Sequence, residues 1–242
     1  MKAFFASLSL AVVLALSGCG GSSSTHKPVV AIVLKTLGSI RMVDVSNGNF
    51  LGTAIPLNGN IRNIAWNDLN DTLYGMGTDM NLYTINVTTG TCTLISPAPM
   101  ALSSYNGGMA FQPGTNTLLF VNQNDDYYKI NALTGTISSQ ETDANISVFG
   151  LAYRSTDNKF YAYSQADTIH SANDLPTSGT FASVGPLGID LSGGLGMSID
   201  PDGEFGYVIC QDGLYKVNLS TGAGSAIDVS QTGEDLVVLG EQ

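Results

Sequence analysis

The segment LYTINVTTG, residues 82–90, decides the fold because closely related segments recur along the chain. Its second half, Ile/Val-Asn-x-x-Thr/Ser-Gly, returns at residues 130–135 (INALTG) and 217–222 (VNLSTG). Weaker copies lie at residues 43–48 and 170–179. The glycines that end the five copies are spaced 42, 45, 44 and 43 residues apart. A period this steady indicates a protein built from repeated structural units.

Each unit contains the pattern of four short strands. The second strand is rich in aromatic residues, the third leads into the repeated turn, and the fourth is short and polar. Strands of this length bounded by Asn, Asp, Gly and Pro, with no helical period, predict an all-β protein. Four antiparallel strands in about 44 residues are typical of a β-propeller blade. The first strand of each unit has a small residue at its centre, as a crowded axis requires: Ala65, Ala110, Ala152 and Ser198.

The five turns predict a five-bladed β-propeller over residues 29–242. Val29–Val33 has the pattern of a second strand with no first strand before it, and Asp235–Leu239 is a first-strand pattern left over at the end. We therefore expect the C-terminal strand to complete blade one and remove an open sheet edge. A β-sandwich and a different blade count are the alternatives. Aromatic residues expected to pack between blades are Trp66, Tyr74, Phe111 and Tyr161.

The pattern L-Y-x-x-x…L-Y-x-I-N-x-x-T-G resembles exported bacterial proteins with quinoprotein-like or YVTN-like propeller repeats, over roughly Val29 to Leu239. The resemblance implies the architecture and no particular activity, because such repeats occur on enzymes and on scaffolds. No quinone-site motif can be matched residue by residue. We therefore expect no cofactor.

A second resemblance lies at the N-terminus. The positive start Met1-Lys2 precedes an apolar run, Phe4–Leu16, that is too short to span a bilayer. The run ends in Leu16-Ser17-Gly18-Cys19, which resembles the lipobox of bacterial lipoproteins. The resemblance implies that residues 1–18 are a signal peptide and that Cys19 carries a diacylglycerol. An ordinary signal peptide and an uncleaved anchor are the alternatives.

The lipobox also implies an address for the mature chain. Three acyl chains, palmitate among them, exceed what stable membrane anchoring requires. Residues 19–28 then form an acylated flexible tether, rich in Gly and Ser. Gly20 stands where Asp would be expected for inner-membrane retention. We therefore expect the outer membrane, facing the periplasm.

Composition excludes several other classes of protein. Nine basic against twenty acidic residues give a formal charge of −11, which argues against a nucleic-acid partner. Charged residues at 12% and 28 glycines argue against a helical bundle. Cys92 and Cys210 fall on units that are not neighbours. We expect two small buried thiols there, not a disulfide.

The candidate ligand face consists of the loops from each fourth strand to the next first strand and from each second strand to the third. Amide and carboxylate groups beside tyrosines suit sugar hydroxyls, and converging carboxylates suit Ca²⁺. Tight β-turns require the same residue types whatever the function, so turn chemistry is the competing interpretation. The candidate residues are Arg62, Asp79, Tyr105, Asn106, Asp126, Asp167, Asp212 and Glu234. The same loops also contribute Asp143, Asn145, Asp190 and Ser192.

Signals for catalysis are few, and we assign no catalytic residue. The turn Asp200-Pro201-Asp202-Gly203 is similar to the D-P-x-G turns of calcium-dependent lactonase-type propellers, but Pro at the second turn position also explains it. Only His26 and His170 are present, which argues against a histidine metal site or a Ser-His-Asp triad. Paired carboxylates on adjacent blades leave a glycosidase open.

These observations favour a membrane-anchored bacterial lipoprotein whose propeller is a non-catalytic binding or assembly module for an envelope protein or a glycan. Converging carbonyls and carboxylates of these loops would suit Ca²⁺. A glycan- or lactone-active hydrolase with acidic residues at the channel mouth is the first alternative. A structural envelope protein is the second.

Overall fold

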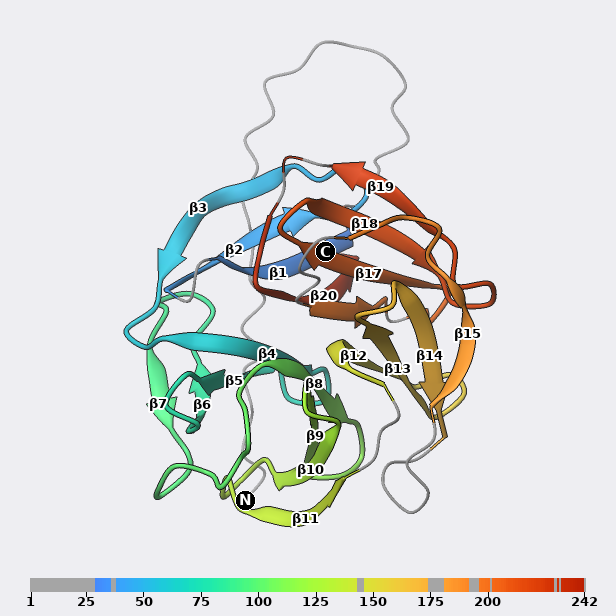
Figure 1. Ribbon diagram of the computed structural model, residues 1–242. Coiled ribbons are helices and arrows are strands. Elements are labelled where there is room, and N and C mark those ends of the chain that lie inside the picture. Colours follow the sequence, from blue (N-terminus) through green and yellow to red (C-terminus); the bar gives the residue numbers. More distant parts are fainter. Residues whose placement is uncertain are drawn as a thin grey trace, which may run out of the picture.

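A computed structural model describes residues 29–35, 38–142, 146–173, 181–191, 196–200, 202–228, 230 and 232–241. Twenty strands in these ranges form five four-stranded antiparallel sheets arranged around one axis (Figure 1). The predicted five-bladed β-propeller is confirmed. No helix in the described part is long and apolar enough to cross a membrane. The predicted signal peptide, tether and acylated Cys19 lie outside the described residues, as do Asp143, Asn145 and Ser192.

Each blade runs from an inner strand at the axis to an outer strand on the rim of the disc (Figure 1). Blade one contains β20 (Asp235–Glu241), β1 (Val29–Lys35), β2 (Ser39–Asp44) and β3 (Phe50–Pro56). Blade two contains β4 (Ile61–Asn67), β5 (Thr72–Gly77), β6 (Leu82–Ile85) and β7 (Cys92–Leu94). Blade three contains β8 (Gly107–Gln112), β9 (Thr117–Asn122), β10 (Asp126–Asn131) and β11 (Ile137–Thr142).

The remaining two blades follow the same order. Blade four contains β12 (Val148–Arg154), β13 (Lys159–Ser164), β14 (Thr168–Ala172) and β15 (Ala182–Pro186). Blade five contains β16 (Gly196–Ile199), β17 (Phe205–Cys210), β18 (Gly213–Asn218) and β19 (Gly224–Asp228).

Because each strand runs from one side of the disc to the other, its two ends lie on opposite sides. We call the side with the predicted ligand loops the loop face, and the side with the turns from first to second and from third to fourth strands the turn face.

The last strand closes the ring, as the sequence predicts. β20 pairs antiparallel with β1, placing Leu236 opposite Val33 and Asp235 opposite Leu34. Leu236, Val237 and Val238 are buried, because their side chains alternate between the neighbouring blades. The pairing leaves no open inner edge on blade one.

Aromatic side chains fill the wedges between blades. Tyr74 of blade two stacks on Phe111 of blade three with ring centroids 5.7 Å apart and planes 9° apart. Both rings are buried in one hydrophobic cluster that the two blades share. Tyr161 is likewise buried between blades four and five. The prediction that these residues pack between blades is confirmed.

The inner strands approach one another most closely near the loop face. A Cβ on Gly108 would lie 2.3 Å from the backbone nitrogen of Leu151, and one on Gly150 would lie 2.7 Å from that of Met197. Gly196 is equally confined, by Asp235 of the closing strand. Glycine is therefore required at this level of β8, β12 and β16. The corresponding residues of β4 and β20 carry side chains: Asn63 Nδ2 donates to the carbonyl of Tyr105 in the loop before β8, and the Asp235 carboxylate accepts from Ile64 of β4.

Candidate functional site

Three predicted candidates meet where blades one and two join on the loop face. Arg62 at the start of β4 forms an ion pair with Glu234, which directly precedes β20. Burial lowers the pKa of Arg62, while Asp235 and the phenol of Tyr105 act in the opposite direction. The backbone carbonyl of Tyr105 accepts a hydrogen bond of 2.8 Å from Asn63 Nδ2. The structure thus gathers Arg62, Tyr105 and Glu234 into one cluster, in which the cation already has a partner.

Asp235 lies directly beneath this cluster and is only 3% exposed. Its Oδ2 accepts a hydrogen bond of 2.7 Å from the backbone nitrogen of Ile64, and its Oδ1 accepts one of 2.8 Å from that of Leu236. Burial raises the pKa of Asp235 well above its usual range, although these two N–H donors and Arg62 oppose the shift. The carboxyl group therefore fastens the last inner strand to β4, across a seam that has no sheet pairing.

The acidic residues of the turns from second to third strands contact tyrosine hydroxyls of their own blades. Asp79 accepts a hydrogen bond of 2.6 Å from Tyr83, and Asp167 accepts one of 2.7 Å from Tyr163. Burial raises the pKa of Tyr163, and the hydrogen bond to Asp167 adds to the shift. The hydroxyl group therefore stays protonated and continues to donate. In these two turns the carboxylate has a structural partner.

Blade three repeats this contact with a larger polar cluster. Asp126 is buried and accepts hydrogen bonds from Ser103 Oγ and, at 3.4 Å, from Tyr128. Asn122 donates to Ser103 Oγ at 2.7 Å, which ties the preceding loop to the turn. The cluster holds the loop between blades two and three against its sheet.

The remaining two candidates also make contacts within their loops. Asp212 accepts a hydrogen bond of 3.3 Å from Tyr215 through its backbone carbonyl. The backbone nitrogen of Asn106 donates to Ser104 Oγ at 3.1 Å, and its carbonyl accepts from Gln123 at 2.9 Å. The structure therefore gives the repeated Asp and Asn residues the contacts of turn chemistry. Candidates from different blades contact one another in the Arg62 cluster.

The structure also shows where the residues lie that metal or triad chemistry would require. Among the described residues, no group of three or more His, Cys, Asp or Glu side chains lies close enough to hold a metal ion. His170 Nε2 lies 3.1 Å from Ser164 Oγ, and burial lowers the pKa of this histidine. Its Nδ1 has no hydrogen-bond partner in the described part of the chain, so no carboxylate there orients the imidazole as a triad would require.

Both remaining thiols are free, as predicted. Cys210 is buried in β17, and burial raises its pKa. Cys92 differs from the prediction because it is only partly buried. The reason is its position: it begins β7, the outer strand of blade two, where one side of the strand faces solvent.

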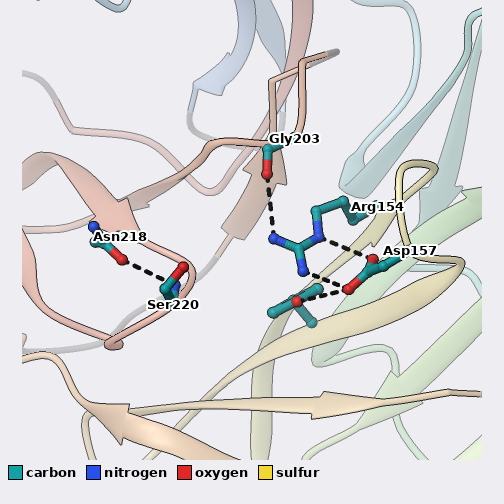
Figure 2. Close-up of polar contacts among 6 residues, drawn as sticks. Arg154, Asp157, Gly203, Asn218 and Ser220 are labelled. Carbon is teal, nitrogen blue, oxygen red and sulfur yellow. Dashed lines mark hydrogen bonds and ion pairs between the residues drawn. The ribbon is translucent and has the colours of Figure 1, made fainter.

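On the turn face, Arg154 joins blades four and five (Figure 2). Its Nε donates to Asp157 at 2.9 Å, its Nη2 also contacts that carboxylate, and its Nη1 donates to the carbonyl of Gly203 at 3.2 Å. Gly203 ends the turn whose D-P-D-G sequence is similar to the turns of calcium-dependent lactonases. Its φ of 72° suits glycine. In the same turn, the carboxylate of Asp200 accepts hydrogen bonds from the backbone nitrogens of Glu204, at 3.0 Å, and Phe205, at 3.3 Å. These contacts are those of a turn that packs against blade four, and they account for Asp200 and Gly203 of the D-P-D-G sequence.

Replacing Arg154 by Ala is expected to lower the free energy of unfolding by about 1 kcal/mol, because a partly exposed ion pair and one inter-blade hydrogen bond are lost. Urea denaturation measures this change. The matched control is Lys159→Ala, which leaves the contacts to Asp157 and Gly203 in place. Equal stability of the Arg154→Ala variant and the unmodified protein would contradict the proposed link between blades.

A cavity of about 120 Å³ opens at the centre of the turn face. Its walls are the inner strands, and its rim is formed by the residues that follow them. Trp66 lines it and also packs, partly buried, against the hydrophobic cluster that blades one and two share, so the prediction that it packs between blades is confirmed. The wall includes Ala65, Ala110, Ala152, Met109, Leu151 and Met197, and the rim includes Asp68, Pro113, Ser155 and Asp200.

Sequence reasoning missed this cavity because it placed the ligand on the loop face. The available signal was the small residue at the centre of each first strand. These residues are too small to fill the axis, so a space remains between them. At the other end, the same axis is closed by the tight glycine contacts.

The closed ring of five four-stranded sheets defines a five-bladed β-propeller. The chain belongs to the family described as "Domain of unknown function (DUF4394)", whose model matches residues 44–240, well over half of its length. A comparison with curated proteins found no match. The family description carries no activity, so function has to be argued from the residues themselves.

Proposed function

We propose that this protein is a non-catalytic binding or assembly module for a protein or glycan, held at a bacterial membrane by an acylated Cys19. The proposal rests on the hydrogen bonds that acidic side chains on the loop face already accept from tyrosines. Asp79, Asp126 and Asp167 each accept a hydrogen bond from a tyrosine of their own blade. The disc therefore offers two rigid surfaces for recognition.

The rival hydrolase needs two carboxyl groups that face each other across a bound substrate, about 5 to 10 Å apart. One candidate at the channel mouth, Glu234, is paired with Arg62. Its neighbour Asp235 is buried under the strands and holds two backbone N–H groups. This geometry favours binding over acid–base catalysis.

Thermal unfolding of the full chain, with Ca²⁺, EDTA and a panel of oligosaccharides, tests the proposal together with assays for lactone and oligosaccharide hydrolysis. A ligand at 100 times its Kd adds about 2.7 kcal/mol to the free energy of unfolding and raises the melting temperature clearly. We expect no turnover of these substrates. Turnover that is lost in a Glu234→Gln variant would contradict the proposal and favour the hydrolase.

The anchor gives a separate prediction. Replacing Cys19 by Ala is expected to remove acylation and to release or mislocalise the protein, because the thiol is the acyl acceptor that the lipobox resemblance implies. Labelling cells with an alkyne analogue of palmitate measures acylation, and Ser22→Ala is the matched control. Acylation that persists in Cys19→Ala would contradict the lipoprotein assignment.

A further inference from the structure

Each inner strand has one edge that pairs with no strand, and this edge faces the axis. β4, β8, β12, β16 and β20 all stand at the end of their sheets, so each pairs with a neighbouring strand on one side only (Figure 1). In an antiparallel strand, the N–H and C=O groups of one residue point to the same side, and successive residues alternate. About half of the backbone polar groups of these five strands therefore point toward the centre of the disc.

Two hydrogen bonds between inner strands show which residues present these groups. The backbone nitrogen of Ile64 in β4 donates to Asp235 at 2.7 Å, and that of Val238 in β20 donates to Ser198 Oγ at 2.9 Å. Both nitrogens therefore point away from their own sheets. Alternation along each strand then gives one residue at the same level of every inner strand, and all five line the axial cavity: Trp66, Phe111, Tyr153, Ile199 and Val238.

The serine that binds the N–H group of Val238 has no counterpart in the other inner strands. The residues in the place of Ser198 also line the cavity, and they are Ala65, Ala110, Ala152 and Val237. Alanine and valine side chains have no hydrogen-bond acceptor, so the N–H groups beside them are presented to the cavity, together with carbonyl groups of the same residues. Buried backbone groups are satisfied by protein, by water or by a ligand. The wall is therefore a ring of both donors and acceptors.

Aromatic rings and carboxylates stand nearer the opening. Trp66 and Tyr153 line the cavity and are partly buried. The hydroxyl group of Tyr153 donates to Asn158 in its own hairpin at 3.0 Å, so the ring is the part of this residue that a ligand meets. Asp68 and Asp200 add acceptors at the rim. Their negative charge disfavours an anionic ligand.

These features together define the chemistry of an occupant. Hydroxyl groups both donate and accept hydrogen bonds, as the strand edges require. The volume of about 120 Å³ equals that of about four water molecules, and a cavity on the order of 150 Å³ takes one six-membered ring. A sugar ring carries hydroxyl groups around its edge and C–H groups on its faces, so it matches a wall of backbone groups with aromatic rings at the mouth.

We propose that the axial cavity binds one neutral sugar residue at the end of a glycan. Its hydroxyl groups bond to the strand edges and to Asp68, and its C–H face lies against Trp66. This inference rests on the proposed binding function, and it names the glycan as the ligand and the turn face as its site. The rest of the glycan continues from the open mouth of the cavity into solvent.

Trp66 is the only tryptophan in the chain, so its fluorescence reports on the cavity directly. The full chain is titrated with five neutral sugars: D-glucose, D-galactose, D-mannose, D-xylose and N-acetyl-D-glucosamine. We expect a saturable change with at least one of them, with a Kd in the millimolar range that a ligand of this size reaches. D-glucuronate, which adds a charge, and cyclohexanol, a six-membered ring with one hydroxyl group, are expected to bind about 5-fold more weakly or less.

A serine at position 152 tests the part played by the strand edges. Ala152→Ser places a hydroxyl group beside the N–H group of Ile199, as Ser198 stands beside that of Val238. We expect this variant to bind the sugar about 2- to 10-fold more weakly, the effect of one hydrogen bond that the ligand no longer makes. Ala54→Ser, the same change on the exposed outer strand of blade one, is the matched control and is expected to bind normally. Thermal unfolding shows that both variants are folded.

A second variant tests the rim without touching the inner strands. Asp68→Ala is expected to weaken sugar binding by about 5-fold or more, because a carboxylate is a strong acceptor for hydroxyl groups. Asn70→Ala, in the same turn but outside the cavity lining, is its control and is expected to bind normally.

Four results would overturn the inference. They are no saturable change with any of the neutral sugars up to about 100 mM, D-glucuronate binding as tightly as the best neutral sugar, cyclohexanol binding as tightly, and unchanged affinity in Ala152→Ser. The proposed function survives each of them if a partner protein or an oligosaccharide still raises the melting temperature, since its site then lies elsewhere on the disc. The proposed function fails separately if the hydrolysis assays show turnover.

Discussion

A chain that ends at Glu234, lacking Asp235–Gln242, is expected to lose its cooperative unfolding transition. β20 is the inner strand of blade one, and it pairs with β1 while packing between β16 and β4. The deletion removes the buried side chains of Leu236, Val237 and Val238, which contribute about 2 kcal/mol each. Their sum of about 6 kcal/mol is comparable with the whole stability of a typical domain.

Circular dichroism during urea and thermal unfolding measures this loss. Deletion of Gln242 alone is the control, because every described strand pairing of β20 remains in that variant. An unchanged melting temperature for the longer deletion would show that the ring does not depend on its last strand, and the closure argument would fail.

Replacing Asp235 by Ala is expected to lower the free energy of unfolding by about 2 to 4 kcal/mol at neutral pH. The backbone N–H groups of Ile64 and Leu236 lose their acceptor, and each buried donor without a partner costs about 1 to 3 kcal/mol. Loss of the destabilising buried charge offsets part of that cost. Glu234→Ala, next to it but on the surface of the seam, is the control and is expected to change stability by less than about 1 kcal/mol.

The pH dependence of stability identifies Asp235 as the cause. Its pKa in the folded protein lies above that of an unfolded-chain aspartate, which is about 3.9. Between these two pKa values the folded state binds the proton more tightly, so this residue's contribution to stability falls as pH rises through that window. The difference in unfolding free energy between the unmodified protein and Asp235→Ala is therefore expected to shrink from pH 4 upward. A difference that grows with pH would contradict a raised pKa.

Much of the fold could be predicted because each repeat contains a turn that requires particular residues close together in the sequence. The turn at residues 85–90 and its copies need Asn and Gly at fixed positions, so the period of the blades is visible in the sequence. Closure by Asp235–Leu239 was predictable for the same reason, since an unpaired first-strand pattern remained at the end. The structure confirms both.

The candidate site was harder to predict because its features depend on side-chain contacts within and between blades that the sequence does not show. Asp79 and Asp167 look like ligand residues in the sequence. Only the three-dimensional structure shows that they accept hydrogen bonds from tyrosine hydroxyls. The axial cavity is shaped by what the inner strands leave empty, and no single residue encodes an empty space. Asp235 likewise looked like an ordinary strand end, although it fastens two blades together.

Site-specific photo-crosslinking in cells tests the central claim, that this propeller is a binding module, most directly. A photo-reactive phenylalanine replaces Leu69 on the turn face or Asp79 on the loop face of the full chain, and both positions are exposed. The account predicts a discrete cross-linked partner protein from at least one of the two positions. No cross-linked protein from either position would contradict a protein-binding role.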